Sequence, residues 1–219
     1  MTKVYPNTNA WDLELEEEEE EPKPVSEGHV VSVLTVWKKS LLFNCNGFTV
    51  FDATGNLAFR VDNYAAGNKG EIVLMDAGGK PLLTIRRKRL SLLGGKWMVF
   101  DGETAVKPRF DVKKHRRSLL KSKSSKLLGE VSSGGSNSNS NSNSNSKKVI
   151  YGMEGSYAQR CCAVYDEKRR CVAEIKRKEA AVGGVDFGVD VFRLIVQPQM
   201  DPVVAMALVI SMDHMFKST

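Results

Sequence analysis

Residues 200–216 read MDPVVAMALVISMDHMF, and this apolar stretch is the strongest structural signal in the chain. Asp201 is placed to cap a helix and Pro202 would occupy its first turn, which predicts a helix over residues 202–216. Every position from Val203 to Ile210 is apolar, so no face is left for water. A helix of about fifteen residues is roughly 22 Å long, shorter than the roughly 30 Å hydrocarbon layer of a bilayer. We therefore expect this helix to be buried inside the protein.

The sequence before the helix is predicted to form strands that can enclose it, because short runs of β-branched and aromatic residues recur along it. Turn-forming sequences at 52–55, 76–79 and 166–169 separate several of these runs. Without amphipathic helices between the strands, the pattern favours a mainly β fold, an antiparallel barrel closed around the helix. The predicted strands are Val30–Trp37, Thr49–Asp52, Leu57–Val61, Glu71–Met75, Leu82–Arg86, Lys96–Phe100, Arg109–Val112, Val149–Met153, Arg160–Tyr165, Cys171–Lys176 and Val191–Val196.

The 219-residue chain is long enough for one ample domain or at most two small ones. Hydrophobic residues make up 42% of it and the mean hydropathy is -0.28, which excludes a multispanning membrane protein and a wholly disordered one. Residues 1–27 hold nine acidic side chains against two lysines and are predicted to form a disordered arm. The alternating Ser and Asn of residues 132–146 predict a disordered loop insertion. The single domain is expected to span residues 28–217.

Several motifs in one order resemble the plant LURP-one-related family over about residues 28–216. They are LTVWKKS at 34–40, GFTVFD at 47–52, FRVDNY at 59–64, LMDAGGKPL at 74–82, and Asp201-Pro202 before the apolar helix. The resemblance implies the tubby C-terminal-like fold, a barrel of about twelve strands threaded by a C-terminal helix. This fold is shared with tubby proteins and phospholipid scramblases. The acidic arm and the Ser/Asn insertion depart from the family pattern without disturbing these motifs.

Positive charge gathers between Lys80 and Lys126, where fifteen Lys and Arg residues stand against three acidic ones. A basic surface attracts polyanions such as phosphoinositide headgroups, nucleic acid or acidic protein segments. Each basic side chain near an anionic leaflet contributes about 1 kcal/mol, so about four to six acting together suffice for reversible attachment. The candidate residues for an anionic headgroup are Arg86, Arg87, Lys88, Arg89, Lys113, Lys114, Arg116 and Arg117.

Relatives in the tubby branch bind phosphoinositides and are viewed as membrane-tethered transcription regulators, and the family name comes from a pathogen-responsive transcript. The resemblance thus implies a non-enzymatic binding module for phosphoinositides or other anionic phospholipids, with a role in plant defence. A nuclear or protein-interaction scaffold that uses the basic patch and the acidic arm is the alternative. The chain lacks a recognisable signature for base-specific nucleic-acid readout. We expect a monomer in the cytoplasm, at a membrane surface or in the nucleus, without a transmembrane span.

An enzyme is not indicated, because the three histidines His29, His115 and His214 are scattered without an evident partner. The Gly-Lys pairs at 79–80 and 95–96 are not followed by Ser or Thr, so they are predicted as turns and not as phosphate loops. We predict no catalytic residue, no cofactor and no metal ligand. The cysteines lack metal-ligand spacing and are expected to be reduced and packed in strands: Cys45, Cys161, Cys162 and Cys171.

Overall fold

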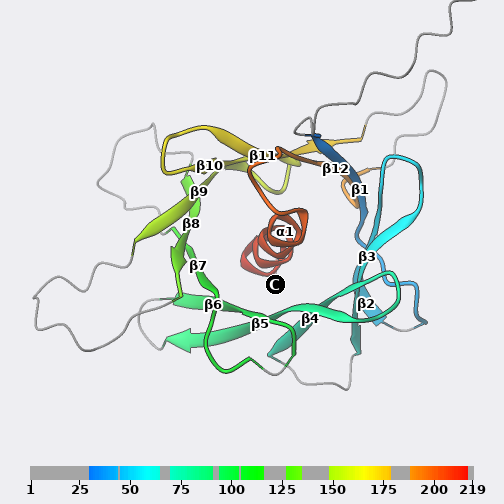
Figure 1. Ribbon diagram of the computed structural model, residues 1–219, viewed down its shortest axis with the longest axis horizontal. Coiled ribbons are helices and arrows are strands. Elements are labelled where there is room, and N and C mark those ends of the chain that lie inside the picture. The colour runs from blue at the N-terminus through cyan, green and yellow to red at the C-terminus, as the bar shows by residue number, and fades with distance from the viewer. Residues whose placement is uncertain are drawn as a thin grey trace, which may run out of the picture.

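The computed structural model describes residues 30–43, 45–64, 70–90, 94–103, 105–115, 127–134, 148–178 and 188–216. Within this part of the chain, twelve strands close into an antiparallel barrel around one helix (Figure 1). The elements are β1 (Ser32–Trp37), β2 (Cys45–Phe51), β3 (Leu57–Tyr64), β4 (Glu71–Asp76), β5 (Pro81–Leu90), β6 (Gly94–Asp101), β7 (Phe110–Lys114), β8 (Leu127–Ser133), β9 (Val149–Ser156), β10 (Cys161–Asp166), β11 (Cys171–Arg177), β12 (Val191–Val196) and α1 (Pro202–Phe216). The acidic arm predicted for residues 1–27 lies outside the described residues.

The barrel has the simplest possible order, because each strand pairs with the next one along the chain. Pairing of β1 with β12 closes the ring, and Leu34 lies opposite Leu194 and Val36 opposite Phe192 in that pair. Closure gives every strand two neighbours, although β3 and β4 pair only through Phe59 with Asp76 and Arg60 with Met75. The mainly β barrel with an enclosed C-terminal helix confirms the fold expected from the sequence.

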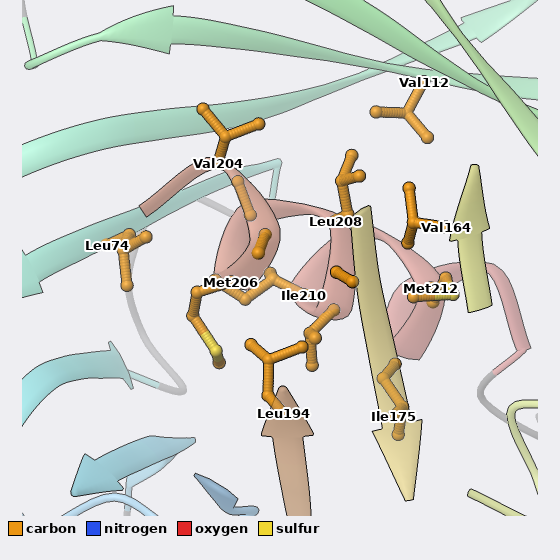
Figure 2. Packing of buried hydrophobic residues seen from close by; sticks show 14 of the residues in the cluster. Leu74, Val112, Val164, Ile175, Leu194, Val204, Met206, Leu208, Ile210 and Met212 are labelled. Carbon is orange, nitrogen blue, oxygen red and sulfur yellow. The ribbon is translucent and has the colours of Figure 1, made fainter. Parts of the chain in front are cut away.

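Helix α1 runs through the middle of the barrel (Figure 1). It begins as predicted, with the carboxylate of Asp201 accepting a hydrogen bond from the Val203 N–H at 2.8 Å. Every side chain from Val204 to Asp213 is buried, and Leu208 points to one side of the helix while Met206 and Ile210 point to the other (Figure 2). The buried Ser211 hydroxyl donates to the Ala207 carbonyl at 2.8 Å, so its polar atom is satisfied within the helix.

The strands alternate in direction, so their connections gather at the two open ends of the barrel. We call the end near Pro202 the helix-start rim and the end near Phe216 the helix-end rim. The three predicted turns lie at the helix-start rim and are confirmed: Gly55 and Gly79 have φ of 88° and 89°, and Arg169 has φ of 61°. Next to each turn, the pairing register between the two flanking strands shifts by one residue. This is the geometry of a type I turn followed by a bulge.

Several details differ from the sequence prediction, including the bounds of some strands. Strand β8 was not predicted, and Ser132 and Ser133 pair within it and do not begin a loop. The remainder of the predicted insertion, from residue 135 to 146, lies outside the described residues. The pair Gly95-Lys96 is not a turn, because both residues lie inside β6 opposite Arg89 and Lys88.

The four cysteines are free thiols and all lie in strands, as predicted. Their environments are not uniform, because Cys161 is exposed whereas its neighbour Cys162 faces the core. Burial raises the pKa of the Cys162 thiol to about 12. The expectation of packing therefore holds for Cys162 and is wrong for Cys161.

Candidate functional site

The two predicted basic clusters lie on strands that both end at the helix-end rim. The first cluster, residues 86–89, lies near the end of β5, and the second, residues 113–117, begins at the end of β7. Strand β6 lies between β5 and β7. In the register, Lys88 is opposite Lys96, and Lys96 is opposite Lys113. Residues directly opposed on antiparallel strands share one face, with Cβ atoms about 4.5–5.5 Å apart. Lys88, Lys96 and Lys113 therefore form one line across three strands, which we call the basic row.

The basic row faces outward from the barrel. Lys88 and Lys113 are exposed and Lys96 is half-buried, whereas the adjacent Trp97 and Val112 are buried in the core. Like charges directly opposed across strands destabilise a sheet. The buried carboxylate of Asp111 offsets part of this repulsion, since its Oδ2 lies 2.8 Å from Lys96 Nζ. The row ends at β8, where Glu130 lies opposite Lys113.

Arg86 is also on the outer face, but its guanidinium group already contacts other groups of the protein. Its Nε lies 3.1 Å from Glu71 Oε2, and its Nη2 donates to the Glu103 carbonyl at 3.0 Å. The guanidinium carbon lies 4.5 Å from the centre of the Phe100 ring. These contacts tie β4, β5 and the chain after β6 together, so Arg86 has a structural role here.

Arg87 and Lys114 point to the inner side of the sheet and line the mouth of the barrel. Arg87 lies opposite the buried Trp97, with its guanidinium carbon 5.3 Å from the ring centre. Lys114 Nζ donates to the Met215 carbonyl at 2.8 Å and lies 4.5 Å from the centre of the Phe216 ring. A cation at this place satisfies a terminal carbonyl and complements the negative end of the helix dipole.

The structure thus separates the predicted residues into groups. It brings Lys88 and Lys113 together on the outer face and turns Arg87 and Lys114 toward the barrel mouth. Arg89 is the second-last residue of β5, opposite Gly95. Arg116 and Arg117 lie outside the described residues.

Sequence reasoning missed Lys96, which joins the two clusters. Its charge stands alone between Gly95 and Trp97, away from either basic run. The alternation of Lys96, Trp97, Met98 and Val99 was the available signal, because it indicates a strand with one outward-facing lysine. Its position opposite Lys88 and Lys113 depends on the pairing register, which the linear sequence does not state.

A second polar group, also missed from the sequence, lies inside the helix-end rim. Asp213 of α1 is buried, and its Oδ1 is 2.8 Å from Lys38 Nζ and accepts a hydrogen bond from the Tyr157 hydroxyl at 3.3 Å. Burial and the Asp213 charge raise the pKa of Tyr157 well above its usual value. The buried Arg160 covers the Tyr157 ring and donates to the Val189 carbonyl at 2.7 Å. These contacts fasten the end of α1 to β1 and to two rim connections.

The described residues hold no group of three or more His, Cys, Asp or Glu side chains placed to bind a metal ion. Within the same ranges, no helix combines the length and the hydropathy that crossing a bilayer requires.

Comparison with known proteins gives a consistent result. A family model described as LURP-one-related matches residues 32–213. Arabidopsis thaliana LURP-one-related 8 is 49% identical over 221 residues, covering 100% of both chains. LURP-one-related 17 from the same plant is 40% identical over 197 residues, covering 86% of this chain and 85% of the relative. None of these names is that of an enzyme.

A solved structure agrees with the architecture. The X-ray structure of an Arabidopsis thaliana protein superposes with a TM-score of 0.57 at 23% identity, covering 84% of this chain and 90% of that one. At this identity the likeness supports the fold alone.

Proposed function

The chain belongs to the LURP-one-related family, and from this premise we propose that it is a non-enzymatic module that binds anionic phospholipid headgroups, phosphoinositides among them, through the basic row. The observation that carries the proposal is the alignment of Lys88, Lys96 and Lys113 on the outer face of three adjacent strands. Such a row opposes folding through mutual repulsion, and a bound polyanion relieves that repulsion. The phosphates of a headgroup supply the required charge.

The size of the effect fits reversible attachment. Each basic side chain close to an anionic leaflet contributes about 1 kcal/mol, so the row gives at most about 3 kcal/mol, screened by salt. Lys96 contributes less than Lys88, because Asp111 already pairs with it. Further basic residues at the same rim add to this attraction, Arg87 among them. Arg86 and Lys114 contribute less, because Glu71 and the Met215 carbonyl already engage them. Attachment of this strength suits a protein that leaves the membrane when conditions change, as a tethered regulator in plant defence would.

The test is sedimentation with phosphatidylcholine vesicles that contain phosphatidylserine or a phosphatidylinositol bisphosphate. The variant Lys88→Glu with Lys113→Glu should bind these vesicles roughly thirtyfold or more weakly, because two favourable charges become repulsive. The matched control is Lys80→Glu with Lys168→Glu, which changes the net charge equally at exposed positions of the helix-start rim. Its affinity should change less than about threefold. Thermal unfolding of each variant checks that the fold is intact.

Equal losses in both variants would mean that only net charge matters, and would contradict a site at the basic row. Binding of the wild-type protein to duplex DNA but not to anionic vesicles would favour the nuclear alternative instead. Retention by pure phosphatidylcholine vesicles to the same extent would exclude headgroup charge as the determinant.

A further inference from the structure

The connection between β1 and β2 presents three consecutive apolar side chains to solvent. Leu41, Leu42 and Phe43 are 50%, 37% and 98% exposed, and we call them the apolar tip. Single exposed apolar residues are ordinary, but adjoining ones mark a surface that another phase or molecule covers. A phenyl ring that is almost completely hydrated is the most unfavourable member of this group.

The apolar tip is held outward by its own base. Ser40 is buried, donates to Asp62 Oδ1, and accepts a hydrogen bond from the Leu42 N–H at 3.0 Å. The Lys39 carbonyl accepts a bond from the Thr49 hydroxyl at 2.7 Å. With its base fixed to β2 and β3 in this way, the loop projects its apolar side chains away from the barrel.

Further apolar surface lies at the foot of the apolar tip. The Lys38 N–H donates to the Asp190 carbonyl at 2.8 Å, which places the chain before β12 beside the end of β1. Trp37 and Val189 in these segments are 36% and 47% exposed. Lys39 Nζ lies 5.2 Å from the centre of the Trp37 ring, so a cation stands next to this apolar surface.

Basic residues share the helix-end rim with the apolar tip. Arg193 of β12 is exposed and lies opposite Thr35 of β1, and the exposed Lys176 of β11 lies opposite Arg193, with its Nζ 2.8 Å from Glu174 Oε2. The basic row reaches the same rim farther around the barrel, on β5, β6 and β7. An apolar projection on a rim that carries cations matches the interface of an anionic bilayer, where acyl chains lie just beneath a layer of phosphates.

We propose that the apolar tip inserts into the interface of an anionic bilayer and that the helix-end rim faces the lipid. This inference rests on the proposed function, because the basic residues bring the rim to the membrane. Charge complementarity selects the bilayer over an apolar protein groove, because the apolar tip shares its rim with Lys39, Arg193 and the basic row, whose charges phosphates would neutralise. Insertion adds a hydrophobic contribution to the electrostatic one and fixes the orientation of the barrel.

The first measurement compares Phe43→Ser with Val106→Ser on phosphatidylcholine vesicles containing phosphatidylserine. Val106 is 89% exposed in the connection between β6 and β7 at the opposite rim, so it is a matched control. We expect Phe43→Ser to weaken binding by about tenfold and Val106→Ser to leave it unchanged. The loss from Phe43→Ser should persist at high salt, whereas the loss from Lys88→Glu with Lys113→Glu should shrink.

The second measurement reports how deeply the apolar tip enters the bilayer, by tryptophan fluorescence quenching, and does not depend on the binding affinity. Phe43→Trp should show quenching by brominated acyl chains beyond that of the wild-type protein, whose Trp37 lies near the same surface. Val106→Trp should show no added quenching. Both replacements place a tryptophan at a strongly exposed position, one on each rim.

The outcomes separate the two proposals. Salt-dependent binding with Phe43→Ser unchanged and Phe43→Trp not quenched would overturn insertion while leaving headgroup binding in place. Failure of the wild-type protein to bind anionic vesicles would overturn both. A concentration-dependent self-association that Phe43→Ser abolishes, without an effect on vesicles, would assign the apolar tip to a second copy of the chain and would also overturn insertion.

Discussion

At the helix-start rim the polar groups of the connections are satisfied by their own neighbours. Three turns repeat one arrangement, in which an aspartate Oδ1 accepts the N–H of the residue four positions later: Asp52 with Asn56, Asp76 with Lys80, and Asp166 with Arg170. At the helix-end rim, by contrast, the basic row and the apolar tip face solvent. At one end of the barrel, polar groups of three turns bond to one another, whereas the other end presents charged and apolar side chains to solvent, where a ligand can contact them.

The charged groups at the two rims also differ in how far neighbouring groups stabilise them. Hydrogen bonds from Thr54 and Asn56 lower the pKa of Asp52, which shows that its carboxylate is stabilised inside its own turn. In the basic row, neighbouring lysines repel each other and Asp111 offsets this only in part. A rim with internally satisfied charge adds little to binding, whereas a rim with excess positive charge attracts anions.

The largest effect should come from breaking the element that couples the two rims. Leu208 is fully buried in the middle of α1. Leu208→Ala removes packing inside a closed barrel and should lower the free energy of unfolding by about 2–5 kcal/mol in denaturant titrations. The same truncation at the exposed Leu41 should change it by less than about 0.5 kcal/mol. Similar small changes at both positions would contradict an enclosed helix.

The next effect concerns only the helix-end rim. Asp213→Ala removes the ion pair with Lys38 and the hydrogen bond from Tyr157, leaving buried polar groups without their acceptor. We expect a loss of about 1–3 kcal/mol in the free energy of unfolding. Asp213→Asn keeps an acceptor for Tyr157 and should recover part of the loss. If both variants unfold like the wild-type protein, the buried cluster does not fasten the end of α1.

The smallest of these effects concerns the helix-start rim. Gly55 has φ of 88° with open space around its Cα, so Gly55→Ala introduces backbone strain without a clash. The expected cost is about 1 kcal/mol, measured as a lower denaturation midpoint. Vesicle binding should stay the same, because the turn lies at the other end of the barrel. Weaker vesicle binding by Gly55→Ala at unchanged stability would contradict the assignment of binding to the helix-end rim alone.

The sequence predicted the features that depend on local chemistry. Asp201 and the apolar run after it identified α1, and the aspartate-containing turns separated neighbouring strands correctly. Strand β8 escaped prediction because its sequence, LLGEVSS, is short and ends in serines that resemble the following Ser-rich stretch. Pairing with β7 and β9 makes those serines extended, and this is a tertiary effect.

The candidate site was predicted in composition but not in geometry. Consecutive residues of a strand face opposite sides, so the run 86–89 could not act as one patch: Arg87 turns to the barrel mouth while Arg86 and Lys88 face outward. The basic row is formed by register across strands, which joined Lys96 to the two clusters. Exposure of the apolar tip was likewise inaccessible from the sequence, since LLF lies between two predicted strands and its apolar composition does not distinguish buried from exposed side chains.

Amide hydrogen exchange of the full chain, with and without phosphatidylserine vesicles, tests most directly whether the helix-end rim is the functional surface. We expect slower exchange at Leu41, Leu42 and Phe43 on vesicles, with unchanged exchange at Thr54, Gly55 and Gly78. Slower exchange confined to those helix-start turns, or equal at both rims, would contradict it.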